Sequence, residues 1–479
     1  MSERVLRGSN RTAVRGLRWF LVAEVIFLIG AGVAAWQGAV RISLMLLIAP
    51  LQLGVLTLFF KSDFRMLAYF VALLPLTALE LVPYDYMRFV MYGVVLGLLV
   101  FLRSTAFLDA QRGPRESSPL TWYRAPLILL GVCVGLAYLN ARAHGWLSPF
   151  VSSYSVLAIQ VLVFAWLVAT VPRSIGQLRQ IIYTAAVGYA VVCFVFPVVM
   201  SHAFLGSGAK TIAVGQAYVN LNAVGAHAAV FAAVATGAAM DARRMVTRIL
   251  LLVVAFLLVV VLVYTRSRGA WVGFGLAFVY IVARTRSFWL ILPAAAVLGV
   301  LLSMDVLHGA LVSRVEATSP DDPSLLGRLL LWRYALIVFK ANWLFGVGME
   351  NFRYVKHFFG YPLSLASSVR YNSHNLLLEF LADLGVAGTA CSFWLLGGTF
   401  LRVDRIARSS ISTRRTWLAV GLNAGLIVFV VHGLFDCIIW QHGAFMILGL
   451  LIGMCLCLER LECSPVSGSD SSPVPERGH

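Results

Sequence analysis

Long apolar segments recur along most of this chain, and they restrict its possible folds more than any other feature. Stretches of roughly 17–25 apolar residues match the length that an α-helix needs to cross a hydrocarbon core about 30 Å thick. Segments such as Ile249–Tyr264 and Leu418–Val431 lack the apolar–polar alternation of barrel strands. The composition, 60% hydrophobic and 12% charged, agrees. The sequence therefore predicts an all-α integral membrane protein.

We expect about twelve to fourteen membrane-spanning helices. The candidate segments are 19–36, 42–60, 66–82, 88–102, 123–140, 151–171, 180–200, 219–240, 249–264, 269–283, 288–303, 375–400, 416–435 and 439–457.

Basic residues orient these helices, because cytoplasmic loops are enriched in Lys and Arg. If the N-terminus is cytoplasmic and the spans alternate, cytoplasmic segments hold 25 of the 38 basic residues, whereas each short external loop holds at most two. Both termini are therefore predicted to be cytoplasmic. The same loops explain the net charge of +17. No basic run is interleaved with aromatic residues as in a nucleic-acid groove, so we expect no nucleic-acid partner.

This map divides the chain into five parts. A basic cytoplasmic N-terminus (1–18) precedes helices 1–11 (19–303), an external loop (304–374), helices 12–14 (375–457) and a cytoplasmic tail (458–479). The tail is rich in Ser and Pro and is predicted to be disordered.

The external loop is much longer than the other connections, and loops of this length are usually functional. Within it, Leu325–Lys340 has a helical pattern but carries three cations. It is too short and too charged for a comfortable span, so we expect a helix lying in the membrane interface, beginning near Pro323.

Arginines gather on the predicted external side. Arg266 and Arg268 occupy a tight turn, Thr265–Gly269, and the long loop adds Arg328 and Arg333 among others. One explanation is that these side chains extend to lipid headgroups. The other is an anion site, because a guanidinium makes two charge-assisted hydrogen bonds to phosphate.

His374 is the candidate general base. Either Asn372 or Ser373 could cap the following helix, which would place His374 in its first turn at the external face. A helix N-terminus disfavours imidazolium and so favours the neutral imidazole that a base requires. The alternative is an interfacial histidine that only satisfies a hydrogen bond. His432 and His442 flank the last external turn beside Asp436, and could line the same cavity.

Three neighbours of His374 are candidate supporting residues. Asn375 and Glu379 share one helix face, and Tyr371 precedes them in the segment. Glu379 lies just inside the membrane, where an ionisable group is costly and usually paired or functional. It could orient His374, pair with an arginine, or support packing.

The chain shows no metal-binding spacing, no P-loop and no nucleotide-binding fold. Asp321 and Asp322 are more simply part of a turn than a cation site. We therefore expect no metal and no cofactor.

Three stretches together resemble the bacterial O-antigen ligase and O-antigen polymerase superfamily of inner-membrane glycosyltransferases. They are Thr265–Gly269 (TRSRG), then Gly327–Trp332 (GRLLLW) with Gly346–Phe352 (GVGMENF), and finally Ser373–Leu376 (SHNL) with Leu384–Gly388 (LGVAG). Each motif alone is loose, but their order around one external loop makes the set more specific.

The resemblance implies a reaction and a site. A glycan would move from undecaprenyl diphosphate to an acceptor hydroxyl at the periplasmic face, among membrane lipids and without metal or nucleotide. The acceptor is a lipid A–core sugar in ligases and another lipid-linked glycan in polymerases. The essential histidine of the family corresponds to His374, and its two arginines to Arg268 and Arg328, with Arg266 competing for the first position.

The chemistry of these residues fits one inverting displacement, with His374 as the base and the arginines stabilising the departing diphosphate. We favour the ligase over an O-antigen or exopolysaccharide polymerase. A polysaccharide transporter or flippase would place ionisable residues near the bilayer midplane, whereas the candidate site charges here gather at one face.

Overall fold

A computed structural model describes residues 63–77, 122–148, 151–194, 211–214, 217–288, 323–362, 372–408, 413–439 and 441–463. In chain order the helices are α3 (Asp63–Thr77), α5 (Arg124–Ala143), α6 (Val151–Thr170), α7 (Ile175–Phe194), α8 (Leu221–Asp241), α9 (Met245–Tyr264), α10 (Arg268–Thr285), α13 (Pro323–Ala341), α14 (Phe352–Val355), the 3-10 helix η4 (Lys356–Phe359), α15 (Leu376–Arg408), α16 (Thr413–Phe435) and α17 (His442–Cys463).

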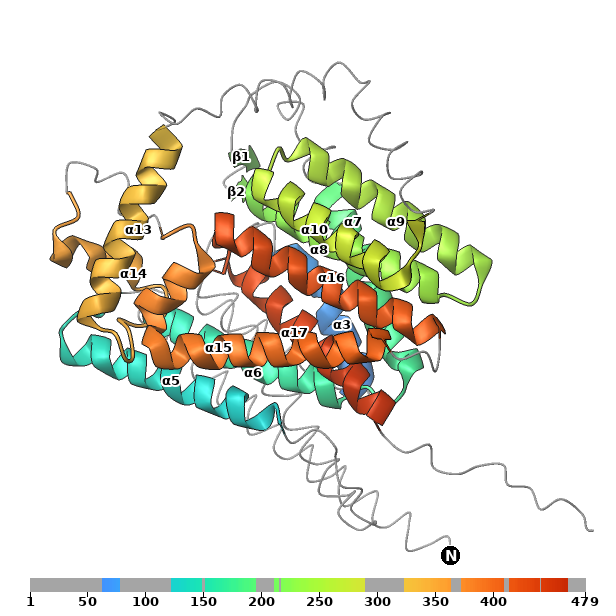
Figure 1. Cartoon of the computed structure of the whole chain (residues 1–479), viewed down its shortest axis with the longest axis horizontal. Helices are drawn as coiled ribbons and strands as arrows, with labels where there is room; N and C mark the ends of the chain where they lie inside the picture. The colour runs from blue at the N-terminus through green and yellow to red at the C-terminus, as the bar shows by residue number, and fades with distance from the viewer. Residues whose placement is uncertain are drawn as a thin grey trace, which may run out of the picture.

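Long helices form a bundle, with α5, α6, α15 and α16 running roughly along one direction (Figure 1). Within the described residues, seven helices are long and apolar enough to cross a membrane: α5, α6, α8, α9, α15, α16 and α17. The chain is thus an all-α, multi-pass membrane protein, as the sequence predicts. A short antiparallel hairpin was not expected. It pairs β1 (Thr211–Val214) with β2 (Ala217–Asn220), two strands rich in β-branched and aromatic residues.

The predicted number of spans can be compared with the structure only over the described residues. Four predicted segments, 19–36, 42–60, 88–102 and most of 288–303, lie outside the described residues. Helices α3, α7 and α10 coincide with predicted spans but are not among the seven that meet the length and hydropathy requirement. The total of twelve to fourteen stays a prediction. Helix α17 ends at Cys463, beyond the predicted end at 457, and residues 464–479 lie outside the description.

Ion pairs fix the relative direction of three helices. Arg284, near the end of α10, lies 2.7 Å from Asp404, near the end of α15. Arg402 of α15 lies 2.9 Å from Glu459, near the end of α17. Because these pairs join C-terminal portions, α10, α15 and α17 run parallel, and their N-terminal ends share the other side of the bundle. The predicted alternation of spans requires this arrangement.

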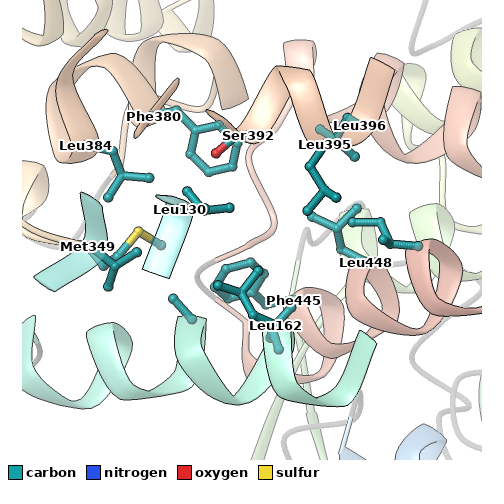
Figure 2. A pocket seen from close by; sticks show the side chains of 14 residues that line it. Leu130, Leu162, Met349, Phe380, Leu384, Ser392, Leu395, Leu396, Phe445 and Leu448 are labelled. Carbon is teal, nitrogen blue, oxygen red and sulfur yellow. The ribbon is translucent and has the colours of Figure 1, made fainter. Parts of the chain in front are cut away.

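An apolar cavity lies between α5, α6, α15 and α17 (Figure 2). It has a volume of about 490 Å³ when the space at its open side is counted. Met349 and Leu384 lie together at one side of it, and Ser392 is the one polar residue in the lining. The cavity therefore offers hydrocarbon-like surroundings and no titratable group.

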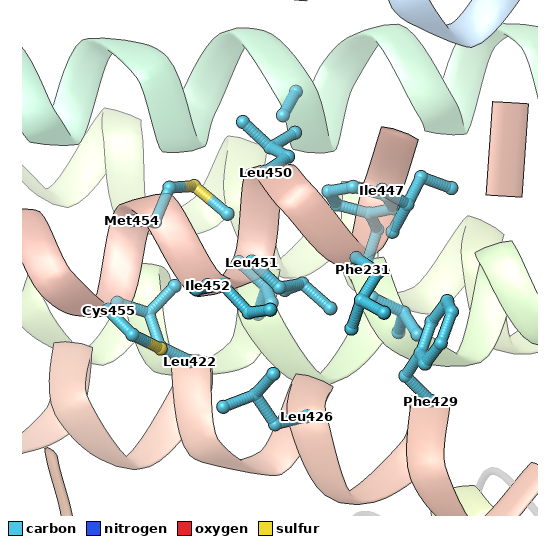
Figure 3. Close-up of a cluster of buried hydrophobic side chains, with 14 of the residues drawn as sticks. Phe231, Leu422, Leu426, Phe429, Ile447, Leu450, Leu451, Ile452, Met454 and Cys455 are labelled. Atoms are coloured by element: carbon cyan, nitrogen blue, oxygen red, sulfur yellow. The ribbon is translucent and has the colours of Figure 1, made fainter. Parts of the chain in front are cut away.

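Helix α8 is the centre of the bundle because its side chains are small. It is rich in Ala and Gly and almost wholly buried. A Cβ added to Gly237 would lie 2.5 Å from Cα of Gly421 in α16, so the two backbones touch. Close backbone contact of this kind drives helix association in lipid, where apolar burial gives little advantage. Larger side chains of α8, α16 and α17, such as Phe231, Phe429 and Leu451, fill the adjacent layer (Figure 3).

Helix α13 crosses the direction of α5 and α15 at one end of the bundle (Figure 1). Its bounds, Pro323–Ala341, agree with the helix that the sequence predicts over Leu325–Lys340. Ala335 and Val338 pack against Val347 and Phe352 of the following segment. The long loop is therefore a folded layer across the helix ends within its described residues.

The contact between α8 and α16 generates a stability prediction. Gly237→Val should destabilise the protein by at least the roughly 1–3 kcal/mol typical of overpacking, because the new methyls would meet backbone atoms that cannot rotate away. Gly275→Val in α10 is the matched control, since a Cβ at Gly275 has no neighbour within 4 Å. Thermal unfolding in detergent measures both. Equal melting temperatures for the two variants would contradict the central role of this contact.

Candidate functional site

His374 does not lie in the first turn of α15, contrary to the sequence-based expectation. The helix begins at Leu376, and its N-cap is Asn375, whose Oδ1 accepts hydrogen bonds from the N–H groups of Leu377 and Leu378 at 3.0 and 3.1 Å. His374 adopts the left-handed conformation, with φ of 52°. Asn372 bonds locally instead of capping the helix, since its Oδ1 accepts from the His374 N–H at 3.1 Å.

The Asn372–Asn375 segment is fixed to the end of α16 by its two outer asparagines. Nδ2 of Asn372 donates to the carbonyl of Cys437 at 3.1 Å, and Nδ2 of Asn375 donates to the carbonyl of Leu434 at 3.0 Å. Asn375 therefore has two roles, as helix cap and as anchor. This second role explains why it, rather than Ser373, begins the helix.

Between these anchors His374 meets a buried carboxylate. Its Nδ1 lies 2.7 Å from Oδ1 of Asp436, immediately after α16. The second oxygen of Asp436 accepts from Nδ2 of Asn222 at 2.7 Å. Asn222 is itself placed by the N-cap of α8, because its N–H donates to Oδ1 of Asn220 at 2.9 Å. Three segments that are distant in sequence thus meet at one carboxylate.

The electrostatics keep Asp436 ionised. Burial alone would raise its pKa, but the hydrogen bond from His374 and nearby positive charge, including that of Arg328, bring the pKa of Asp436 down to about 2. A carboxylate that accepts the Nδ1–H of an imidazole fixes the tautomer in which Nε2 is the basic nitrogen. The pair of His374 and Asp436 therefore has the form of a base held by an orienting acid.

Asp436 was not among the candidate site residues from sequence, which noted it only beside His432 and His442. A carboxylate directly after a predicted span was the available signal. His432 is buried, and its carbonyl accepts the Asp436 N–H at 2.8 Å. The two ring nitrogens of His432 have no hydrogen-bond partner among the described residues. The side chain of His442 lies outside the description.

The TRSRG turn sits against the same end of α16. Helix α9 ends at Tyr264 and α10 begins at Arg268. A Cβ added to Gly269 would lie 3.0 Å from Cβ of Phe435, the residue before Asp436. Arg266 has a left-handed backbone with φ of 52°, and both arginine side chains are half-buried. The turn that carries both arginines therefore lies near the pair of His374 and Asp436, here called the dyad.

Arg328 reaches the site from α13. Trp332, one turn later on the same face, donates its indole N–H to the carbonyl of Ser373 at 2.9 Å. This bond directs that face of α13 toward the His374 segment, and the charge of Arg328 acts on Asp436. Arg333 is exposed. The structure thus brings Arg328 toward the dyad and leaves Arg333 in a more peripheral place.

Glu379, in the first turn of α15, supports the His374 segment through a hydrogen bond. Its Oε2 accepts the N–H of Ser373 at 2.7 Å, and the side chain is fully buried. Of the alternatives left open by the sequence, this geometry favours orientation of the segment that carries His374. Tyr371 lies outside the described residues.

The GVGMENF and LGVAG motifs lie in two segments that hydrogen-bond to each other. The Val347 N–H donates to the Ala382 carbonyl at 3.0 Å, and the Val386 N–H donates to the Trp343 carbonyl at 2.7 Å. Between them Gly385 breaks α15, with φ of 63° and ψ of −168°, and a Cβ there would lie 2.4 Å from the carbonyl carbon of Leu344. The predicted span 375–400 is therefore two helical pieces, with loop backbone inserted at the break.

Among the described residues, no group of three His, Cys, Asp or Glu side chains is arranged to hold a metal ion. The expectation of a site without metal or cofactor stays a prediction.

The lowered pKa of Asp436 gives a pH prediction. A carboxyl with a depressed folded-state pKa stabilises the fold above its unfolded pKa of about 3.9 and loses that contribution as pH falls toward about 2. We expect Asp436→Asn to cost on the order of 2 kcal/mol at neutral pH. The gap in melting temperature between wild type and variant should narrow between about pH 4 and pH 2. A gap that is constant across this range would contradict the role of the charge.

One known family model matches most of the segments that form this site. Residues 253–393 match the family model described as O-antigen ligase. No curated protein matches the chain in a sequence comparison. The matched range contains the arginine turn, α13, the GVGMENF segment, His374 and the break at Gly385, and it ends before Asp436. With its membrane-spanning helices, the chain is a multi-pass membrane protein whose residues 253–393 are similar to the O-antigen ligase superfamily.

Proposed function

We propose that this protein transfers a glycan from undecaprenyl diphosphate to a sugar hydroxyl of lipid A–core at the periplasmic face of the bacterial inner membrane. The observation that carries the proposal is the dyad of His374 and Asp436, 2.7 Å apart, next to arginines from two other segments. The family match supports the same class of enzyme, a glycosyltransferase acting on lipid-linked glycans.

The proposed reaction is one displacement at the anomeric carbon. Nε2 of His374 takes the proton of the acceptor hydroxyl while that oxygen forms a bond to C1 of the donor sugar. The bond from C1 to the diphosphate oxygen breaks, and undecaprenyl diphosphate leaves with the electron pair. Attack opposite the leaving group inverts the anomeric centre. Asp436 keeps the imidazole in the correct tautomer and stabilises the imidazolium that forms.

The arginines act on the leaving group. The diphosphate is already anionic and gains charge as the C1–O bond breaks, so fixed guanidinium groups stabilise the transition state more than the ground state. Arg268 or Arg266 would bind from the junction between α9 and α10, and Arg328 from α13. In this proposal the protein supplies the positive charge, without a metal or a nucleotide.

The proposed orientation follows from the distribution of basic residues. The parallel arrangement of α10, α15 and α17 places their N-terminal ends, with Arg268 and His374, on one side of the bundle. The positive-inside rule assigns the arginine-rich ends to the cytoplasm. The site would then face the periplasm, with both termini cytoplasmic.

A polymerase of the same superfamily is the alternative, because the family match does not separate the two reactions. The base and the arginines would do the same chemistry on the hydroxyl of a second lipid-linked glycan. The difference lies only in the acceptor.

A transfer assay with purified protein in detergent tests the proposal. Undecaprenyl-diphosphate glycan is supplied with EDTA and without nucleotide, and lipid A–core is present in one tube and omitted from the other. We expect product on lipid A–core only in the first tube. His374→Ala should lower the rate by about 10²–10⁴-fold, the usual contribution of a general base. Arg268→Ala and Arg328→Ala should also lose activity.

Lys340→Ala, at an exposed position near the end of α13, is the matched control and should retain the wild-type rate. Longer lipid-linked chains formed without lipid A–core would establish the polymerase instead. Near-normal transfer by His374→Ala would exclude His374 as the base.

A further inference from the structure

The first turn of α8 contacts two different parts of the candidate site. Nδ2 of Asn222 donates to Oδ2 of Asp436 at 2.7 Å. Gly225 follows three residues later and therefore shares a helix face with Asn222. A Cβ added to Gly225 would lie 2.5 Å from Oγ1 of Thr265 and 3.0 Å from Cβ of Ser267, in the TRSRG turn. One face of α8 is thus directed at the dyad and at the arginine turn together.

The backbone of Asn222 is fixed by the residue that caps α8. Asn220 has an extended backbone, with φ of −82° and ψ of 111°, and its Oδ1 accepts the Asn222 N–H at 2.9 Å. Asn220 also ends β2 and pairs with Thr211 of β1. The cap and the hairpin therefore hold the backbone from which the short side chain of Asn222 projects, and this gives its amide a defined direction.

The Asp436 carboxylate needs such a partner if it is to orient an imidazole. A carboxylate with one partner can turn about its Cβ–Cγ bond and move away from that partner. Here Oδ1 lies 2.7 Å from Nδ1 of His374 while the amide of Asn222 holds Oδ2. Hydrogen bonds to an ionised acceptor are about twice as strong as neutral ones, so Asn222 restricts this rotation effectively. The two bonds together fix the plane of the carboxylate.

We infer that Asn222 is a positioning residue for His374: its amide holds the Asp436 carboxylate in the orientation that accepts the Nδ1–H, so that Nε2 stays the basic nitrogen. The inference rests on the proposed function for its catalytic consequence, whereas the effect on the imidazole stands without it. Asn222 precedes the range that matches the family model, residues 253–393, and Asp436 follows it. The structure thus extends the candidate site beyond that range on both sides.

Nitrogen NMR of the imidazole rings tests the positioning directly and does not depend on any reaction. The protein is labelled with ¹⁵N in its histidine rings, and the His374 signals are identified by their absence from His374→Ala. We expect the neutral ring of wild type to carry its proton on Nδ1. Asn222→Leu has a similar size but no donor, so its His374 signals should move toward the average of the two tautomers. Unchanged His374 signals in this variant would overturn the inference.

Thr236→Val is the matched control in the same helix. Oγ1 of Thr236 donates to the carbonyl of Ala232 at 2.8 Å, within α8 and away from the first turn. This variant should leave the His374 signals as in wild type. Equal changes in Thr236→Val and Asn222→Leu would overturn the inference, because they would indicate a general response of α8.

Transfer kinetics test the catalytic consequence. Asn222→Leu should lower kcat by about 10–100-fold, as expected for a misplaced base, with KM for the donor within about threefold of wild type. Combined with Asp436→Asn, it should be no slower than Asp436→Asn alone, because Asn222 acts through that carboxylate. Additive losses would overturn the inference.

Asn222→Asp adds a test with a defined sign, and it serves if Asn222→Leu does not fold. Two carboxyls at this distance cannot readily ionise together, so the pair keeps one proton at a pH where a lone Asp has lost it. While that proton is present, the new carboxyl and Asp436 share a hydrogen bond that replaces the one from the amide. As pH rises and the proton leaves, the bond is lost and the two charges repel each other.

The ratio of kcat in Asn222→Asp to kcat in wild type should therefore fall at least ~10-fold between about pH 5 and pH 8, in protein that remains folded. His374, His432 and Arg328, the other groups whose charge acts on Asp436, are the same in both proteins, so the ratio largely removes their titration. The corresponding ratio for Asn222→Leu should change little with pH. A constant ratio for Asn222→Asp would overturn the inference.

The two proposals can fail separately. Altered His374 signals in Asn222→Leu, together with full transfer by His374→Ala, would support the positioning role and refute the proposed base. Loss of transfer in His374→Ala, with unchanged ring signals and normal kcat in Asn222→Leu, would support the base and refute the inference.

Discussion

The arrangement of the candidate site depends most on one buried carboxylate, that of Asp436. Asp436 follows α16 directly, and its two oxygens accept hydrogen bonds from His374 and Asn222. A buried charge without such partners would be very costly, so these bonds tie the segment before α15 and the start of α8 to the end of α16. The start of α10 reaches the same place through Gly269. The position of the candidate base is therefore set by long-range contacts rather than by the helix that follows it.

A second constraint is the break in α15. A helix interrupted inside a bundle leaves backbone groups that need partners, and in lipid these must come from the protein. At Gly385 the partners are main-chain groups of the segment 343–348, so the loop between α13 and α14 is bound to a membrane-spanning helix. The break thus attaches the loop layer rigidly to the bundle. As a result α13, with Arg328, has a fixed place relative to His374.

Local features of the sequence predict local structure well here. Hydropathy gives the spanning helices within the described ranges, and the helix over 325–340 follows from its own pattern. His374, Arg268 and Arg328 could be proposed from motif order, and the structure brings them to one end of the bundle. The N-cap of α15 was wrong because Asn375, Asn372 and Ser373 are equally good caps by type, and only the contact of Asn375 with Leu434 decides. The role of Asp436 and the break at Gly385 likewise depend on segments more than 40 residues away.

The arrangement also bears on how a carboxylate can lie near arginines that are proposed to bind a diphosphate. An exposed Asp436 would compete with the phosphates for the guanidinium groups. Both of its oxygens are instead used by His374 and Asn222, so Arg328 acts on it through charge and at longer range. A guanidinium in that position can bind a phosphate while His374 keeps its tautomer. The dyad and the proposed anion site can therefore work side by side, which the proposed displacement requires.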